Sequence, residues 1–284
     1  MQNTAILLVS CPDRRGLVAA IAEFLYSHGA NILHADQHQD SDARLFFMRV
    51  EWDLDGFDLD EGALRGAFQR VAERFGMEWR LEYSSARPAV AIFVSRYQHC
   101  LADLLHRFRA RELAGTLAVV VGNHPDAQEI TGFYGVPFHH IPVEGGNKTP
   151  AELRQRELLE LHGVRLVVLA RYMQVLSPEF VARHPRRIIN VHHSFLPAFS
   201  GARPHHAAFQ RGVKLIGATS HYVTDALDDG PIIEQDVTRV SHRDSLPDFI
   251  QKGADLERVV LSRAVRWHLE HRILCYGNKT VVFD

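Results

Sequence analysis

AVAIFVS, at residues 89–95, is the first of four short apolar runs that decide the fold of the larger part of this chain. The other three are LAVVVGN (117–123), RLVVLA (165–170) and RRIINV (186–191). Stretches of helical or loop character separate them, such as residues 99–112 and 150–162. Apolar strands that alternate with helices are typical of βαβ units, so we predict a mostly parallel, Rossmann-like sheet buried on both faces.

Downstream of these runs, residues 214–223 and 231–240 are predicted to form two further strands, and residues 245–270 a long closing helix. In sheets of this kind, ligands bind beyond the carboxyl ends of the strands. NVHHSF, at residues 190–195, lies at such an end. We therefore look for the functional site there.

Upstream, the first 84 residues have a different pattern. An apolar strand is followed by an amphipathic helix, two alternating strands, a second helix and a last strand, at residues 5–9, 17–25, 31–39, 44–52, 60–75 and 77–83. This βαββαβ order predicts a sheet with helices on one face. SSARP ends with a proline and resembles a linker, so we predict an α/β protein with domains at 1–84 and 89–284 joined by residues 85–88.

Composition and charge narrow the class of partner. The 284 residues include 32 basic and 34 acidic side chains, interspersed, for a net charge of −2. Such a balance offers no electrostatic footprint for nucleic acid or an anionic membrane, so small molecules or protein surfaces are the expected partners. The length allows two domains.

The three cysteines indicate a reducing compartment. Cys11, Cys100 and Cys275 are odd in number and far apart, which argues against a disulfide framework. The first apolar run has no basic region before it and is too short to span a membrane. We expect a cytoplasmic protein.

Asn190 and His192 are the strongest candidates for chemistry. They are two residues apart on a predicted strand, so they share one face, while Val191 and His193 point away. Asp228 lies in a loop that could return to the same strand end and orient the imidazole. The three residues would supply an amide donor, a proton shuttle and an orienting charge for acyl chemistry. The alternative is that Asn190 and His192 merely cap the strand end.

Other motifs are uninformative. No P-loop, GxGxxG, HExxH, CxxC or GxSxG pattern is present in its required context. The remaining histidine groups lack a spacing that converges on a metal, so we predict no metal site at His34, Asp36 and His38, or at the doublets His139-His140 and His205-His206.

Four stretches of the second domain carry a family resemblance: VVLARYMQVLSPEF, INVHHSFLPAF, GATSHYVTDALDDGPIIEQDV and VSHRDS. They resemble the folate-dependent formyltransferase fold and, most closely, the formyltetrahydrofolate deformylase family. The first domain, with LLVSCPDRRGLVAAIAEFLYSHGANI and FFMRVEW, looks like the ACT domain of the same family. The resemblance covers nearly the whole chain.

The resemblance implies hydrolysis of 10-formyltetrahydrofolate to formate and tetrahydrofolate, without a cofactor or metal. This hydrolysis would supply formate for purine synthesis and would balance the one-carbon folate pools. It assigns catalysis to Asn190, His192 and Asp228. It assigns substrate binding to two segments, represented by Met173, Gln174, Val175 and Leu176 and by Asp225 and Leu227 in the loop that ends at Asp228.

The acceptor distinguishes hydrolase from transferase. Transferases of this fold that act on glycinamide ribonucleotide have a glycine-rich phosphate loop, whereas the corresponding strand exit here is VSRYQHC, residues 94–100, without glycine. His193 and Phe195 also follow the deformylase form. Water is therefore the expected acceptor. An amine formyltransferase is the alternative, followed by a folate-binding sensor without catalysis.

The resemblance also implies an effector site in the first domain. Asp13, Gly16 and Asn31 match ACT positions that bind a small amino acid, such as glycine or methionine, where two copies meet. Gly16 would let a backbone approach the ligand and Asp13 would hold its ammonium group. On the residues alone, a helix N-cap and a turn glycine remain an alternative. ACT pairing implies a homo-oligomer.

Overall fold

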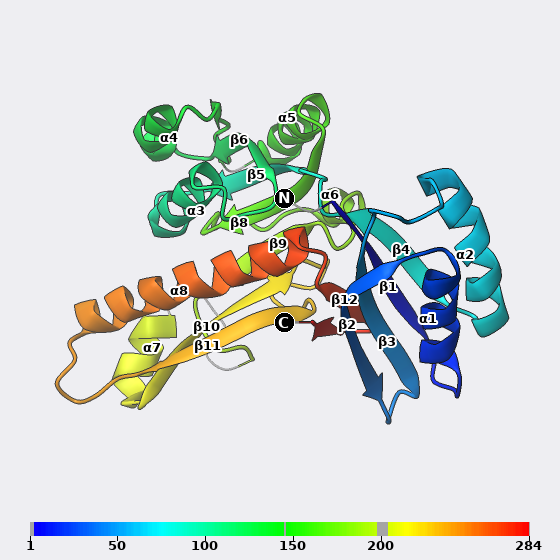
Figure 1. Cartoon of the computed structure of the whole chain (residues 1–284). Helices are drawn as coiled ribbons and strands as arrows, with labels where there is room; N and C mark the ends of the chain where they lie inside the picture. Colours follow the sequence, from blue (N-terminus) through cyan, green and yellow to red (C-terminus); the bar gives the residue numbers. More distant parts are fainter. Residues whose placement is uncertain (1–2, 145, 198–203, 284) are drawn as a thin grey trace. The chain divides into compact units, whose positions relative to one another are not determined.

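The computed structural model describes residues 3–144, 146–197 and 204–283, so the last two residues of INVHHSFLPAF, 198 and 199, lie outside the described residues. The chain forms two compact units (Figure 1). The first contains the described residues up to Ala86, together with Glu270–Tyr276 and those from Thr280 onward. The second contains Arg87–Leu269 and Gly277–Lys279.

The first unit has the βαββαβ order that the sequence predicts. Its elements are β1 (Thr4–Pro12), α1 (Leu17–Ser27), β2 (Asn31–Asp40), β3 (Leu45–Asp53), α2 (Glu61–Phe75) and β4 (Glu78–Tyr83). The strands form an antiparallel sheet in the order β2-β3-β1-β4. Consequently β2 is an edge strand, and all 10 of its residues are exposed or only partly buried.

Helices α1 and α2 cover one face of this sheet (Figure 1). Their apolar residues recur at helical spacing, so that Leu17, Ile21 and Phe24 of α1 pack with Phe68 of α2 over the strands. Asp60 starts α2, because its carboxylate accepts a hydrogen bond from the Ala63 backbone N–H at 2.8 Å. This face holds the core of the unit.

The opposite face of the sheet is covered by a hairpin from the other end of the sequence, made of β12 (Ile273–Tyr276) and β13 (Lys279–Val282). Val281 and Phe283 pack there against the buried side chains Ile6, Leu8 and Phe47. The sequence placed residues 270–284 in the second domain, and this assignment differs from the structure for 270–276 and the described residues from 280. Periodicity shows that a hairpin is apolar but not which sheet it covers.

The second unit is built on a seven-stranded sheet in the order β11-β10-β9-β8-β5-β6-β7. The strands are β5 (Ala89–Val94), β6 (Thr116–Gly122), β7 (Phe138–His140), β8 (Val164–Ala170), β9 (Ile188–His192), β10 (Leu215–Tyr222) and β11 (Ile232–Arg239). From β9 to β7 neighbouring strands are parallel, whereas β10 is antiparallel to both β9 and β11. The predicted mostly parallel sheet is confirmed.

Helices pack against this sheet (Figure 1). They are α3 (His99–Arg109), α4 (Gln128–Tyr134), α5 (Lys148–Leu161), α6 (Pro178–Ala182), α7 (Pro204–Arg211) and α8 (Leu246–Leu269), with a short 3-10 turn at Pro125–Ala127. The long helix α8 packs on β9, β10 and β11 and also on α3. Among the described residues, no helix is both long and apolar enough to cross a membrane.

Candidate active site

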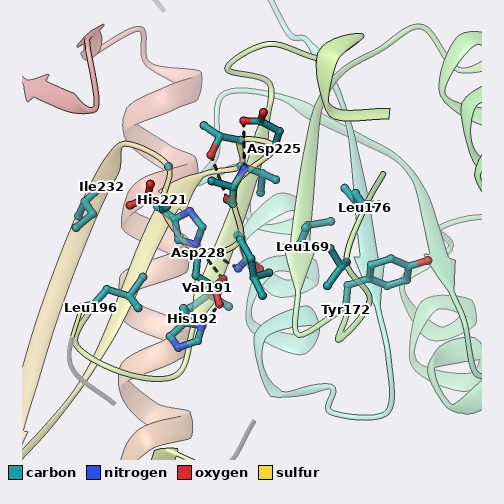
Figure 2. Close-up of a pocket in the computed structure, with 18 of the residues that line it drawn as sticks. Leu169, Tyr172, Leu176, Val191, His192, Leu196, His221, Asp225, Asp228 and Ile232 are labelled. Atoms are coloured by element: carbon teal, nitrogen blue, oxygen red, sulfur yellow. Dashed lines mark hydrogen bonds and ion pairs between the residues drawn. The ribbon is translucent and has the colours of Figure 1, made fainter. Parts of the chain in front are cut away.

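The carboxyl-terminal end of strand β9 places Asn190 and His192 at one cavity. Asn190 pairs with Leu169 of the parallel strand β8, and His192 pairs with Thr219 of β10, so both residues sit in the ladder near the carboxyl end of β9. The cavity has a volume of about 1020 Å³, and both residues line it; His192 is labelled in Figure 2. The predicted location of the site, beyond the strand ends, agrees with this cavity.

Asp228 reaches the cavity because the loop after β10 folds back. Strand β10 runs antiparallel to β9, and its last residue, Tyr222, pairs with Ile189. The loop then closes where the Tyr222 backbone N–H donates to the Pro231 carbonyl at 2.9 Å. At Gly230, a Cβ atom would collide with the Tyr222 carbonyl oxygen, so only glycine fits this closure. Asp228 itself has a left-handed backbone, with φ of 54°.

Two imidazoles face the carboxylate of Asp228 (Figure 2). His192 Nδ1 lies 3.1 Å from Asp228 Oδ2, and His221 Nε2 lies 3.6 Å from Asp228 Oδ1. Hydrogen bonds from His192, and then from His221, hold the pKa of Asp228 well below its ordinary value, against the opposing effect of burial. Asp228 is thus a carboxylate at neutral pH and orients both rings.

Two further polar atoms belong to this network, on Asn190 and on His192. Asn190 Nδ2 lies 3.3 Å from His221 Nε2. His192 Nε2 is buried and, among the described residues, has no hydrogen-bond partner. A buried polar atom without a partner is costly, and such atoms are often functional. The bonded partners of Asn190 and His192 are side chains, which favours the catalytic interpretation over strand-end capping.

His221 was missed by the sequence reasoning, although it completes the network. Its place on β10 opposite Asn190 follows only from the strand register, which the sequence does not state. His221 Nδ1 lies 2.9 Å from the Tyr222 carbonyl oxygen, and that contact fixes the ring. If the pairing of β9 with β10 had been known, the motif GATSHYV, residues 217–223, would have indicated His221 as a neighbour of Asn190.

The expectation that His193 points away from the site is wrong, because His193 lines the cavity and its ring stacks on that of His192. Val191, within the strand, is also among the lining residues. Strand β9 ends at His192, so the alternation of side chains no longer governs His193. The rings of His192 and His193 stack with centroids 4.9 Å apart and planes at 28°. Burial, followed by the charge of Arg171, lowers the pKa of His193 to about 3.

The residues expected to bind substrate line the same cavity. Met173, Gln174, Val175 and Leu176 follow β8, and Asp225 and Leu227 lie in the loop that carries Asp228. Met173, Val175 and Leu227 are 51%, 58% and 68% exposed, which is unusual for large apolar side chains. One wall of the cavity is therefore polar, and its rim is apolar and open.

A buried charge network adjoins His193. Glu257 of α8 lies 2.6 Å from His99, 3.3 Å from Arg171 and 3.9 Å from His205. Burial would raise the pKa of Glu257, but His205, His99 and Arg171 together lower it to about 2. No sequence pattern points to this glutamate, because it lies among the apolar residues of a long helix.

One group of side chains among those described has the spacing of a metal site. Ligand atoms of His99, Cys100 and Glu257 all lie within 4.8 Å of one another. Burial raises the pKa of the Cys100 thiol well above its ordinary value, and a neutral thiol is a poor ligand. Arg171 also bonds to the same carboxylate. Both features disfavour a cation there.

The residues expected to bind an effector are only partly together. Asp13 and Gly16 line a second cavity of about 330 Å³ in the first unit, and Gln39 donates to Asp13 at 2.6 Å. Asn31 is not among the lining residues. It begins β2 and pairs with Asp53, whereas Gln39 pairs with Phe46 near the other end of the strand. Within one chain, Asn31 is thus remote from the other two.

Comparison with known proteins gives a consistent result. Residues 5–73 match the ACT domain, and residues 89–265 match the formyl transferase family. A formyltetrahydrofolate deformylase of Synechocystis sp. is 53% identical over 284 residues, covering 100% of both chains, and one of Bacillus subtilis is 50% identical over 279 residues, covering 98% and 93%. The crystal structure of a formyltetrahydrofolate deformylase from Pseudomonas syringae pv. tomato has a TM-score of 0.97 and 48% identity, covering 100% of this chain and 95% of its own.

Proposed function

We infer the chemistry of the cavity from the premise that this chain belongs to the formyltetrahydrofolate deformylase family and hydrolyses 10-formyltetrahydrofolate to formate and tetrahydrofolate. The reacting groups that we propose are Asn190, His192 and Asp228. The observation that supports them best is the pairing of His192 Nδ1 with Asp228, which leaves the buried Nε2 without a partner in the described chain.

The proposed reaction is acid-base catalysis by His192. Asp228, as a carboxylate, accepts a hydrogen bond from the His192 Nδ1–H, and this tautomer leaves the Nε2 lone pair of His192 facing the cavity. His192 takes a proton as water attacks the formyl carbon, and the amide of Asn190 donates to the oxyanion. His192 then returns the proton to N10 of the folate as the bond from carbon to N10 breaks. The products are formate and tetrahydrofolate.

Folate binding is proposed for the rim. The exposed side chains of Met173, Val175 and Leu227 supply an apolar surface on which a flat pterin ring can pack. Gln174 and Asp225 offer polar groups at the same rim. The formyl group would then extend inward to His192, so that the released formate could enter purine synthesis while tetrahydrofolate returns to the folate pool.

The first experiment measures formate and tetrahydrofolate release from 10-formyltetrahydrofolate with no amine present. We expect equal amounts of both products, complete loss in His192→Ala, and a loss of at least about 100-fold in Asp228→Asn, which stays folded. Release that needs an added amine would identify a formyltransferase. Near-normal turnover in Asp228→Asn would refute the role of that carboxylate.

An amino-acid effector site is proposed where two copies pair through β2. This strand is an open edge, and edge strands are natural sites of pairing. A twofold, antiparallel pairing of two β2 strands sets the Asn31 end of one copy beside the Gln39 end of the other. That arrangement would bring Asn31 of one copy to the cavity lined by Asp13 and Gly16 of its partner, which no single chain achieves.

The effector proposal is tested with glycine and methionine. We expect one of them to change the hydrolysis rate or raise the melting temperature, and Asp13→Asn to abolish that response. Gly16→Ala provides a second test, because φ of 92° at this position strains any other residue. Light scattering should show a homo-oligomer that Asn31 substitutions weaken. If neither amino acid changes the rate or the melting temperature, and no oligomer is found, the proposal has no support.

We place this reaction in the cytoplasm. The support is that Cys11, Cys100 and Cys275 are all free thiols.

A further inference from the structure

His193 is unusually placed for a residue that the acid-base steps above do not use. It lines the reactive cavity, is 8% exposed, and stacks on His192. No hydrogen bond joins its ring nitrogens to the part of the chain that the structure describes. An imidazole with both nitrogens uncommitted, beside the proton-transferring residue, is equipped to hold a small polar molecule.

The surroundings of His193 keep its imidazole neutral. Burial disfavours the charged form, and the nearby charges of Arg171, His192 and His205 act in the same direction, so that its pKa falls to about 3 although Glu257 opposes them. A neutral imidazole has one N–H donor and one lone pair. It can therefore accept a hydrogen bond from water, which a histidinium cannot.

The charge network around Glu257 comes close to this ring through His205. The His205 ring lies 5.9 Å from that of His193, with the two planes at 56°. Glu257 bonds to Arg171 and His99 and lies near His205. On the same helix, a Cβ at Gly253 would collide with the His205 ring, so glycine is required for this approach. A network with one buried carboxylate at its centre thus lies next to His193, with His205 between them.

We propose that His193 holds the attacking water against the formyl carbon, and that Glu257 positions His193 for this role. The proposal rests on the hydrolysis inferred above. The lone pair of His193 accepts one O–H of the water, and His192 Nε2 takes the proton of the other as the new bond from oxygen to carbon forms. When the bond from carbon to N10 breaks, His192 protonates N10. Formic acid leaves and loses its remaining proton to solvent.

The test compares water with a nucleophile that needs no such holder. Wild-type protein, His193→Phe and His193→Asn are assayed for formate, and for formyl hydroxamate in the presence of hydroxylamine. We expect His193→Phe to lower kcat for hydrolysis at least about 100-fold and leave KM for 10-formyltetrahydrofolate within about threefold. The ratio of hydroxamate to formate should rise at least about tenfold, since hydroxylamine bypasses the held water. His193→Asn should retain intermediate hydrolysis.

Two further variants separate positioning from general damage. Glu257→Gln should lower hydrolysis about tenfold and shift the product ratio in the same direction as His193→Phe. His184→Phe is the matched control, because His184 also stacks on a ring, that of Phe180, with centroids 5.0 Å apart and planes at 28°. It does not line the reactive cavity. We expect unchanged kinetics in His184→Phe.

Distinct outcomes would overturn the proposal. If His193→Phe hydrolyses the substrate within about threefold of wild type, the ring does not hold the water. If hydrolysis and hydroxamate formation fall equally, His193 acts only on His192. Should His193→Phe fail to fold, the same criteria apply to His193→Asn. Absence of formate release by the wild type without an amine would instead refute the proposed function.

Discussion

Gly230 is the residue on which the position of Asp228 depends. Because a Cβ there would collide with the Tyr222 carbonyl oxygen, Gly230→Ala must open the loop that carries Asp228. We expect kcat for formate release to fall at least about 100-fold, as for loss of an acid-base partner. Gly132→Ala is the control: apart from its chain neighbours and the backbone of its own helix, nothing described lies within 4 Å of its Cβ position, and alanine favours the helix. Equal activity of both variants would contradict this account.

At the same scale, the sequence identified the site only in part. Strand alternation placed Asn190 and His192 on one face, and the loop sequence suggested Asp228, since these inferences need only local geometry. His221 and Glu257 escaped, because each reaches the network through register or packing between segments far apart in the sequence. His193 was assigned to the wrong face, because the sequence does not mark where β9 ends.

At the scale of elements, the hairpin β12–β13 is expected to stabilise the first unit. Phe283 is 5% exposed and packs with Ile6, Leu8 and Phe47, so Phe283→Ala leaves a cavity in that cluster. We expect a loss of about 3 kcal/mol in the free energy of unfolding, measured by urea denaturation. Phe133→Ala removes the same aromatic ring from a side chain that is 74% exposed. It should lower the free energy of unfolding far less. Similar losses would argue against the hairpin's role.

Long, strongly periodic elements could be predicted from the sequence, whereas short ones could not. The expected helix at residues 60–75 and the closing helix at 245–270 agree closely with α2 and α8. Strand β7, with 3 residues, and helix α6, with 5, are too short to show a period of 2 or 3.6. The hairpin was missed for a further reason, since its partner sheet begins some 270 residues earlier in the chain.

At the scale of the whole molecule, buried histidines should make stability depend on pH. Burial lowers the pKa of His193 to about 3 and of His271 to about 4, whereas an unfolded histidine titrates near 6.5. Between these values the unfolded chain binds more protons, so stability falls as the pH drops below 6.5. Each group contributes up to about 1.4 kcal/mol per pH unit.

Urea denaturation between pH 5 and pH 6.5 tests this, because carboxylates titrate mainly below about pH 5. We expect His193→Asn and His271→Asn each to flatten the dependence of stability on pH. His184→Asn is the control, because the His184 ring stacks on Phe180 and is neither of the two histidines whose pKa is lowered by burial. A slope that neither variant alters would mean that the two buried rings do not govern acid sensitivity.

The hairpin also has a consequence for how the protein is made. Residues 4–83 leave the ribosome first, yet the strands that cover Ile6, Leu8 and Phe47 are translated only after residues 87–269 of the second unit. Throughout that interval the nascent sheet presents an apolar face without its own cover, a state that invites chaperone binding or aggregation. Messages truncated before codon 270 should therefore yield an insoluble product, even though both sheets are encoded in full.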